Sequence, residues 1–216
     1  MQPIDALVVD DGSPDGTGGI VRARAEADPR IRLIERPGKA GLASAYAIGF
    51  RRGLDERYDL IAEMDSDLSH RPDELPRLLE TVQGHDVAIG SRYVPGGSVT
   101  NWSRLRVGLS KGGNAYARLC LGFPVRDATS GFRVYRRAAL ETLVAAPITS
   151  EGYGFQIELV LRAWRAGLSI GEAPITFSER THGHSKISRR IVVEALWLVT
   201  RWGARARFRP DAAGPP

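Results

Sequence analysis

The sequence predicts an α/β protein whose mostly parallel sheet is covered by helices on both faces. Up to residue 90, short apolar runs alternate with segments of helical periodicity, and turn residues separate them. Strands are predicted at 4–9, 31–34, 60–64 and 87–90, with helices at 17–27, 42–54 and 72–82 between them. Strands that alternate with helices form parallel sheets, in which ligands bind beyond the carboxyl ends of the strands.

Beyond residue 90 the pattern is less regular. Segment 94–101 is rich in glycine and is predicted to be a loop. Further predicted elements are an added strand at 132–135, helices at 105–121, 155–166 and 188–202, an extended stretch at 170–177 broken at Pro174, and a polar, mobile loop at 178–186. We expect one domain over residues 1–209 and a disordered tail over 210–216.

Composition narrows the class of protein. The single cysteine, Cys120, excludes an intramolecular disulfide. The formal net charge of +5 suits an anionic partner such as phosphate or a membrane surface. No nucleic-acid-binding module is recognised, so nucleic acid is not an expected partner. The sequence has neither the pattern of a signal peptide nor an apolar run of about 18 residues that would span a membrane.

Asp65 and Asp67 follow the predicted strand at 60–64 directly. Carboxylates two residues apart, where a strand continues into a turn, can converge on one cation. Oxygen ligands of this kind suit Mg²⁺ or Mn²⁺, which keep several waters and bridge to substrate phosphates. The alternative is a cap for the helix that begins near Pro72.

A second acidic cluster follows the first predicted strand. Asp10, Asp11 and Asp15 lie within six residues, between that strand and a helix. Three carboxylates so close together repel one another unless a cation or donor groups lie among them. An Asx turn with a helix cap is the alternative, and it accounts for one of the three.

Basic residues supply the other half of a candidate diphosphate site. They are Arg92 after the fourth strand, Arg106 and Lys111 on a predicted helix, and Arg180 and Lys186 around a glycine-containing loop. Arginine binds phosphate oxygens in a two-pronged manner, whereas lysine acts as a mobile point charge. Each residue alone could be a solvated surface charge. The set, combined with the acidic clusters, indicates a site that binds metal and phosphate together.

Seven short motifs follow one another along the chain: VVDDGSPDGT at 8–17, GKAGL at 38–42, MDSDLSH at 64–70, GSRY at 90–93, DATSGFR at 127–133, GYGFQIE at 152–158 and FSERTHGHSK at 177–186. Together, over residues 4–200, they resemble the family-2 glycosyltransferases of GT-A (Rossmann-like) fold, in particular the dolichol-phosphate (polyprenol-phosphate) mannose synthases. That family begins with a β-α unit and a turn that packs on the nucleotide base, and the sequence apparently lacks this first unit.

The resemblance implies a role for each matching residue. Binding of the nucleotide sugar would fall to Asp10, Asp11, Asp15, Lys39, Asp65, Ser66, Asp67, Arg180 and Lys186. The metal, Mg²⁺ or Mn²⁺, would be held by Asp65, Asp67 and Ser69, where Ser69 occupies a position at which some relatives carry glutamine. Catalysis would involve Asp67, Arg92, Arg106, Arg180 and Lys186, with Arg92 and Arg106 on the acceptor phosphate. Asp127, Gln156 and Glu158 would shape the sugar and acceptor end.

The implied reaction is metal-dependent, inverting transfer of mannose from GDP-mannose to a polyprenyl (dolichyl) phosphate. The alternatives are a polyprenyl-phosphate glucosyltransferase, another family-2 transferase, and a truncated, non-catalytic fragment. We expect a cytoplasmic enzyme, peripheral on the inner face of the cell membrane, with a membrane protein as a further candidate partner. The predicted helix at 188–202 either lies in the membrane interface or packs on the sheet.

Overall fold

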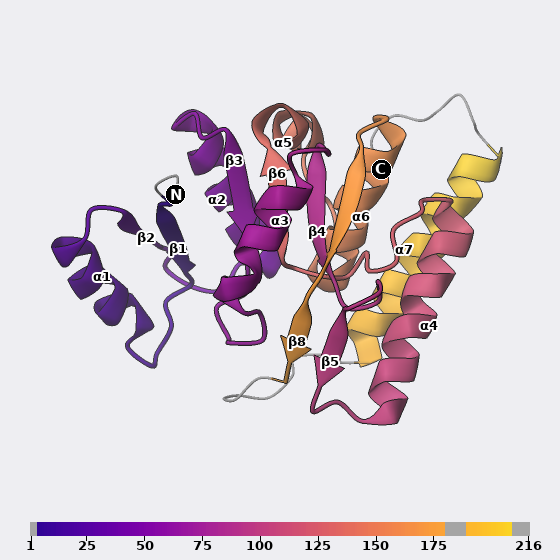
Figure 1. Ribbon diagram of the computed structural model, residues 1–216, viewed down its shortest axis with the longest axis horizontal. Helices are drawn as coiled ribbons and strands as arrows, with labels where there is room; N and C mark the ends of the chain where they lie inside the picture. The colour runs from indigo at the N-terminus through magenta and orange to yellow at the C-terminus, as the bar shows by residue number, and fades with distance from the viewer. Residues whose placement is uncertain (1–3, 180–188, 209–216) are drawn as a thin grey trace. The chain divides into compact units, whose positions relative to one another are not determined.

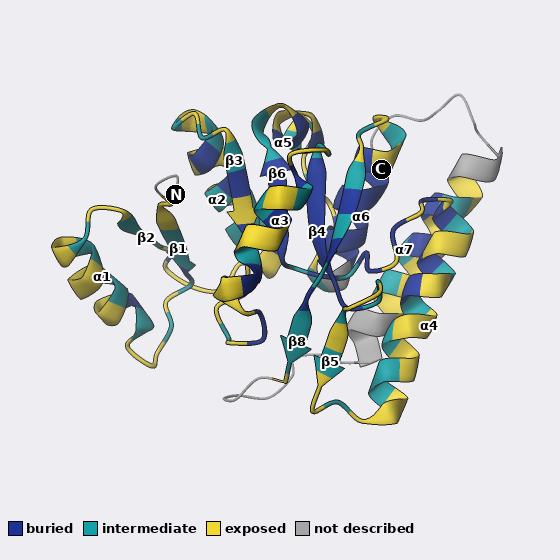
Figure 2. Ribbon diagram, viewed as in Figure 1, coloured by how far each residue is buried: buried dark blue, intermediate teal, exposed yellow. Residues whose placement is uncertain are grey.

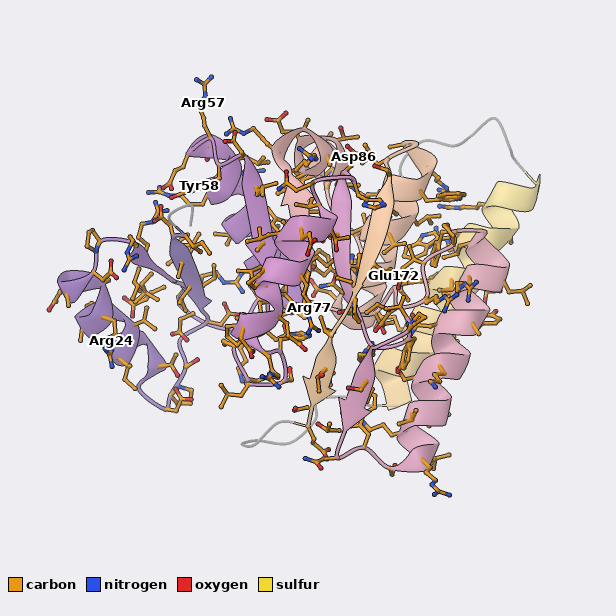
Figure 3. The ribbon with its side chains drawn as sticks, viewed as in Figure 1. Arg24, Arg57, Tyr58, Arg77, Asp86 and Glu172 are labelled. Carbon is orange, nitrogen blue, oxygen red and sulfur yellow. The ribbon has the colours of Figure 1, made fainter. Side chains whose placement is uncertain are left out.

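The computed structural model describes residues 4–179 and 189–208. The chain forms two compact units, Met1–Arg57 and Tyr58–Pro216, and each is described by itself. Arg57 and Tyr58, which mark the boundary, are labelled in Figure 3. The expectation of one domain over residues 1–209 stays a prediction. The tail at 210–216 and the segment that holds Arg180 and Lys186 lie outside the described residues.

The first unit is a β-α-β-α segment. It consists of β1 (Ala6–Asp10), α1 (Thr17–Ala27), β2 (Ile31–Glu35) and α2 (Leu42–Asp55). β1 and β2 pair in parallel, with Ala6 opposite Ile31 and Asp10 opposite Glu35. The α1 helix packs on both strands, and α2 packs on β1. The predicted strand-helix-strand-helix order is confirmed for this unit. The two strands can run in the same direction because a helix connects them.

The second unit contains a four-stranded sheet in the order β3-β6-β4-β7 (Figure 1). Its strands are β3 (Leu60–Glu63), β4 (Val87–Ser91), β6 (Arg133–Arg136) and β7 (Ile170–Pro174), and a separate parallel pair is formed by β5 (Ser98–Thr100) and β8 (Thr176–Ser178). The helices are the 3-10 turn η1 (Pro72–Glu74), α3 (Leu75–Thr81), α4 (Arg104–Leu121), α5 (Arg137–Val144), α6 (Gly152–Arg165) and α7 (Arg189–Phe208).

Three features of the second unit differ from the pattern read in the sequence. The predicted added strand is present as β6, and it runs antiparallel between β3 and β4. The segment predicted to be a loop at 94–101 contains β5, whose three residues pair with the distant β8. The α5 helix was not predicted, although it buries Ala139, Leu140 and Leu143. Short elements of this kind depend on non-local partners rather than on their own periodicity.

Both faces of this sheet are covered. On one face, Val134 of β6 packs with Leu78 and Val82 of the α3 region in the hydrophobic core. Side chains alternate along a strand, so the neighbouring Arg133 and Tyr135 point to the opposite face, where they are also buried. There Arg133 donates a hydrogen bond to the backbone oxygen of Gln156 in α6. The expectation of helices on both faces is therefore confirmed for this unit (Figure 2).

The last helix, α7, packs against α4 and α6. Its residues Val199 and Trp202 are buried, and Gly203 approaches the backbone of Cys120 so closely that a Cβ atom would lie 2.8 Å from the carbonyl oxygen. Part of this helix thus packs on the protein, while Val193 and Trp197 are exposed. Within the described ranges, none of the helices combines the length and apolar character that crossing a membrane requires.

Candidate active site

The loop that follows β3 carries the predicted metal ligands Asp65 and Asp67, both partly buried. Ser69 donates two hydrogen bonds to Asp67 Oδ1, one from its backbone N–H at 3.0 Å and one from its hydroxyl. Ser69 is fully buried, and Leu68 adopts a left-handed conformation with φ of 63°. The described contacts of Ser69 therefore orient Asp67, and its predicted role as a metal ligand stays a prediction.

His70 anchors the same loop from the inside. Its Nδ1 accepts a hydrogen bond from the backbone N–H of Asp65 at 3.4 Å, and its ring contacts the rings of both Phe132 and Phe177. Burial lowers the pKa of His70, which outweighs the raising effect of the Asp65 charge. The neutral ring then carries its proton on Nε2, an atom without a hydrogen-bond partner in the described part of the chain. His70 is thus placed to hold the loop in shape.

The chemistry of Asp65 and Asp67 fits a divalent cation that is shared with a bound diphosphate. Among residues 4–179 and 189–208, no three His, Cys, Asp or Glu side chains are grouped so as to hold a metal ion by themselves. Mg²⁺ at phosphate sites is nevertheless usually held by one or two carboxylates, with waters and phosphate oxygens completing its shell. Two carboxylates on one short loop meet that requirement, so Asp65 and Asp67 fit a divalent cation of this kind.

A buried polar cluster lies behind Asp65. Gly131 faces the Asp65 carboxylate: a Cβ atom at this glycine would lie 3.5 Å from Asp65 Oδ2 and 3.6 Å from Nε2 of Gln156. Glu63, the last residue of β3, accepts a hydrogen bond from Tyr135 and lies 3.6 Å from Nε of Arg133. Burial raises the pKa of Glu63 to about 7, although the charge of Arg133 opposes this shift.

Arg92 and Asp127 form a deeply buried ion pair in the candidate site. The guanidinium donates from Nε at 2.7 Å and from one terminal nitrogen at 2.6 Å to the two carboxylate oxygens. It also donates to the hydroxyl of Thr129. Burial raises the pKa of Asp127, but the charge and hydrogen bonds of Arg92 outweigh this and hold the pKa below its usual value. The predicted contact of Arg92 with acceptor phosphate stays a prediction.

The loop that carries Asp127 is itself fixed by side chains from two elements. Glu172 of β7, labelled in Figure 3, accepts hydrogen bonds from the backbone N–H groups of Arg126 and Asp127 at 2.9 and 3.0 Å. Asn114 of α4 accepts a hydrogen bond from the backbone N–H of Ala128 at 2.8 Å. These contacts fix the loop in the position from which Asp127 pairs with Arg92.

Arg106, near the start of α4, lies on an aromatic surface. Its guanidinium is 4.0 Å from the centre of the Trp102 ring and donates to the Glu179 carboxylate at 2.7 Å. Phe177 meets the edge of Trp102, and Arg92 lies over the ring of Phe177 at 5.2 Å. Arg92 and Arg106 are therefore brought together around Trp102 and Phe177, on the same side of this unit.

In the first unit, Asp10 and Asp11 end β1 and begin the next turn. Asp10 is buried, and its carboxylate accepts a hydrogen bond from the backbone N–H of Ser13 at 3.1 Å. Asp11 forms an ion pair with Arg36, which is buried and also donates to the Ser44 hydroxyl at 2.7 Å. Sequence reasoning missed Arg36. Its position directly after β2 is the signal that could have found it.

The other two predicted residues of this unit lie in exposed loops. Asp15 accepts hydrogen bonds from the backbone N–H and the hydroxyl of Thr17, and these bonds lower its pKa. This is the local turn geometry that an Asx motif predicts. Lys39 is exposed between β2 and α2. The nucleotide-binding roles of Asp10, Asp11, Asp15 and Lys39 stay predictions, as does the role of the exposed Ser66 in the second unit.

Of the three residues expected to shape the sugar and acceptor end, Glu158 has contacts that are structural. Its carboxylate pairs with Arg162 at 2.5 Å, one turn along α6, and accepts hydrogen bonds from the backbone of Thr149 and Ser150. The Trp102 ring and the Glu63–Arg133 pair were not found by sequence reasoning. Their signal is weak, because a single tryptophan or a buried charge in a short strand has no distinctive local pattern.

Comparison with known proteins identifies the family. Residues 1–144 match the family model described as glycosyl transferase family 2. The chain therefore belongs to glycosyl transferase family 2. It is 50% identical over 204 residues to a protein of Micrococcus luteus named undecaprenyl-phosphate mannosyltransferase, covering 94% of this chain and 84% of that protein. It is also 50% identical over 207 residues to the polyprenol monophosphomannose synthase of Mycolicibacterium smegmatis, covering 95% and 78%.

The fold is shared with solved structures of low sequence identity. Glucosyl-3-phosphoglycerate synthase from Mycobacterium tuberculosis, in complex with Mn²⁺, UDP-glucose and phosphoglyceric acid, aligns with a TM-score of 0.62 at 20% identity, covering 92% of this chain and 68% of that one. The same enzyme in complex with phosphoglyceric acid aligns with a TM-score of 0.63. The predicted fold class and the resemblance stated from the motifs are both confirmed.

Proposed function

We propose that this glycosyltransferase transfers mannose from GDP-mannose to a polyprenyl phosphate. The observation that carries the proposal is the identity of 50% with two proteins whose names specify a mannosyl transfer involving a polyprenol phosphate, over nearly the whole of this chain. Fold alone would not support a choice of sugar, since one fold hosts many reactions. The choice of GDP as the nucleotide rests on the motif resemblance.

For the donor, we assign Asp65 and Asp67 to a divalent cation on the diphosphate, and Asp10, Asp11, Asp15 and Lys39 to the nucleotide. The two carboxylates after β3 supply oxygen ligands of the kind that Mg²⁺ or Mn²⁺ binds at phosphate sites. When bound, the cation would neutralise charge that develops on the departing diphosphate. His70 and Ser69 support this assignment, because their hydrogen bonds keep the loop and Asp67 in one arrangement.

For the acceptor, we assign Arg106 and Arg92 to the polyprenyl phosphate. Arg106 is partly exposed, with 28% of its side chain accessible, so one face of its guanidinium can meet an anion. Lys111 lies five residues further along α4, with its Nζ 5.6 Å from the centre of the Tyr93 ring, and adds a positive charge to this part of the helix. A planar guanidinium supported by the Trp102 ring loses little freedom when it binds a phosphate oxygen.

The proposed chemistry is a single displacement. A phosphate oxygen of the acceptor forms a bond to the anomeric carbon, the bond from that carbon to the diphosphate oxygen breaks, and GDP leaves with the electron pair. A phosphate monoester has a second pKa near ~6 and is already anionic at neutral pH, so no strong general base is needed. Attack opposite the leaving group would invert the anomeric centre. The buried, neutral His70 is consistent with a site that lacks a base.

The acceptor is a lipid, and we assign the bilayer-facing surface to α4 and α7. Exposed apolar side chains form one stripe on each helix: Leu105, Leu109 and Leu119 on α4, and Val193, Leu196 and Trp197 on α7. The hydroxyls of Tyr116 and Thr200, at 2.8 Å, join the two helices along these stripes. Exposed apolar side chains gathered on two neighbouring helices favour a site of interaction with a protein or membrane.

The charge of these two helices favours an anionic lipid surface as the partner. The α4 helix has four basic and no acidic residues, and α7 has five basic residues and one acidic residue. Their combined formal charge is +8, whereas the whole chain carries +5. Arg104, Lys111 and Arg118 recur every seven residues along the exposed side of α4. An apolar stripe beside basic residues is typical of a helix that lies in a membrane interface.

The experiment that tests the proposed function compares two donors with one acceptor. The purified chain is supplied with polyprenyl phosphate and Mg²⁺, and release of GDP from GDP-mannose is measured beside release of UDP from UDP-glucose. We expect GDP release that depends on the lipid phosphate, together with formation of a mannosyl lipid. Turnover of UDP-glucose alone would identify a glucosyltransferase instead. A folded chain that turns over neither donor would contradict the proposed function.

A further inference from the structure

The side-chain amide of Gln156, in the second turn of α6, is buried and has no hydrogen-bond partner within residues 4–179 and 189–208. It is 3% exposed, and neither its oxygen nor its nitrogen has a hydrogen-bond partner among the described residues. A buried polar group without a partner destabilises the folded state, and native proteins keep few of them. The backbone of Gln156 is well fixed, because its oxygen accepts a hydrogen bond from Arg133 at 3.1 Å. The fold therefore fixes the backbone from which the amide extends, while no described residue forms a geometrically complete hydrogen bond with the amide.

The surroundings of this amide point toward Asp65. Because Gly131 has no side chain, a small space remains whose borders include Asp65 Oδ2, at 3.5 Å from an ideal Cβ position, and Gln156 Nε2, at 3.6 Å. Glu63 lies beside the amide, and its buried Oε2 also has no hydrogen-bond partner in the part of the chain that the structure describes. The side-chain amide of Gln156 is close enough to Glu63 to lower the pKa of that carboxyl in the manner of a weak hydrogen bond, although none of their described atoms meets the full geometry of one. Unused donors and acceptors thus gather beside one predicted metal ligand.

We propose that Gln156 is a positioning residue for Asp65, whose carboxylate accepts a hydrogen bond from Gln156 Nε2 when a divalent cation and a diphosphate are bound. A hydrogen bond to one carboxylate oxygen fixes the direction in which the other oxygen meets the cation. Gly131 leaves the space in which the two groups approach each other. This inference rests on the proposed function, since it needs the cation at Asp65 and Asp67.

The test replaces the amide with an apolar side chain of similar size in the full chain. For Gln156→Leu, calorimetry should show Mn²⁺ with GDP binding about tenfold more weakly, the low end of the loss seen when partners of metal ligands are removed. The melting temperature of the metal-free protein should stay the same or rise, because an unpaired buried amide has been removed. A purely structural glutamine would instead lower the melting temperature and leave the affinity of the folded protein unchanged.

Two further variants sharpen the test. Gly131→Ala keeps the amide but puts a methyl group in contact with both groups, 3.5 Å from Asp65 Oδ2 and 3.6 Å from Gln156 Nε2, so it should hinder their approach and also weaken binding of Mn²⁺ with GDP. If Gln156→Leu fails to fold, the affinity of Gly131→Ala for Mn²⁺ with GDP tests the inference in its place. The matched control is Gln83→Leu, which removes an exposed amide whose nitrogen donates to the Leu79 carbonyl, and it should bind like the wild type.

Equal affinity of wild type and both site variants for Mn²⁺ with GDP would overturn the inference while leaving the proposed function standing. A loss confined to GDP-mannose, with GDP unaffected, would also overturn it, because the amide would then contact the sugar. Failure of the wild type to bind Mn²⁺ with GDP would contradict the proposed function itself, and the inference would fall with it. The three results are distinguishable in one series of titrations.

Discussion

Arg92 and Asp127 form a two-pronged ion pair in which 5% and 0% of the two side chains are exposed. The pair joins the residue after β4 to the loop before β6, and Thr129 binds the same guanidinium. Removing one partner of such a pair leaves a buried charge without compensation, which typically costs about 3–5 kcal/mol. The pair is thus a structural requirement of the candidate site as well as a candidate part of its chemistry.

We predict that Asp127→Asn destabilises the protein by about 3 kcal/mol at neutral pH, because Arg92 stays buried with a neutral partner. The pKa of Asp127 is lowered in the folded state from the ordinary value of 3.8. Its stabilising contribution is therefore present above pH 3.8 and is lost as the pH falls below it. Urea unfolding at several pH values should show this acid-dependent loss in the wild type and less of it in the variant.

The matched control for that experiment is Asp86→Asn, at a partly exposed carboxylate that binds Ser169 and whose pKa is also lowered. We expect a loss of about 1 kcal/mol or less for this surface group. Equal stabilities of Asp127→Asn and the wild type would contradict the structural importance of the Arg92–Asp127 pair.

Asp67→Asn should abolish most of the mannosyl transfer. The amide keeps an acceptor for the Ser69 hydrogen bonds but removes the charge that attracts the cation, so we expect kcat to fall at least about 100-fold while the fold persists. Chelation of divalent metal with EDTA should have the same effect on the wild type, and Mn²⁺ should restore it. Activity that survives EDTA would show that Asp65 and Asp67 do not act through a metal.

Arg106 and Glu179 should affect the acceptor in opposite directions. Arg106→Gln removes a donor to phosphate and should raise KM for the polyprenyl phosphate about tenfold, since a charged hydrogen bond contributes about 1.5–3 kcal/mol. Glu179→Gln frees the same guanidinium from its ion pair and should lower that KM, by no more than about fivefold because exposed pairs contribute about 1 kcal/mol at most. The KM for GDP-mannose serves as the internal control in both variants.

A second control for the Arg106 series is Arg22→Gln, which breaks an exposed pair with Glu35 in the first unit. We expect unchanged KM values for both substrates. Equal acceptor KM values for Arg106→Gln, Glu179→Gln and the wild type would contradict the assignment of Arg106 to the acceptor phosphate.

Arg36→Met should destabilise the first unit, because Arg36 is buried and its ion pair with Asp11 and hydrogen bond to Ser44 are lost together. We expect a loss of about 2–3 kcal/mol, less than for a fully buried pair because Asp11 is partly exposed. If Asp11 also contacts the nucleoside, the affinity for GDP should fall in parallel. Thermal unfolding and GDP titration of the same preparation measure the two effects.

The exposed apolar stripes of α4 and α7 should determine how strongly the protein binds a membrane. Leu109→Glu and Trp197→Glu each place a charge in the exposed apolar stripes, and we expect either change to weaken co-sedimentation with vesicles of phosphatidylglycerol and phosphatidylcholine severalfold. Ile20→Glu, at an equally exposed position on α1, is the matched control and should bind like the wild type. Equal binding by all variants would show that the surface does not face lipid.

The alternation of strands and helices in the first unit, and most of their bounds, could be predicted to within one or two residues. The α1 helix spans the predicted residues 17–27, and β2 extends the predicted strand by one residue. Such elements are readable because apolar periodicity and turn residues act over a few positions of the chain. The direction of β6 and the existence of β5 were not readable, because strand pairing depends on partners far away in the sequence.

The sequence by itself determined where acidic residues follow strands. The apolar pattern of a strand and the point where it stops, at Asp10 for β1 and before Asp65 for β3, are local properties of the chain. It also determined the family, through motifs whose order is independent of their contacts. Only the tertiary structure decided which charges pair, Asp127 with Arg92 and Arg36 with Asp11. It alone also placed the Gln156 amide, which has no hydrogen-bond partner among the described residues, near Asp65. The physical reason is that the energy of a buried charge or amide depends on the groups within a few ångströms, and those groups come from distant parts of the chain.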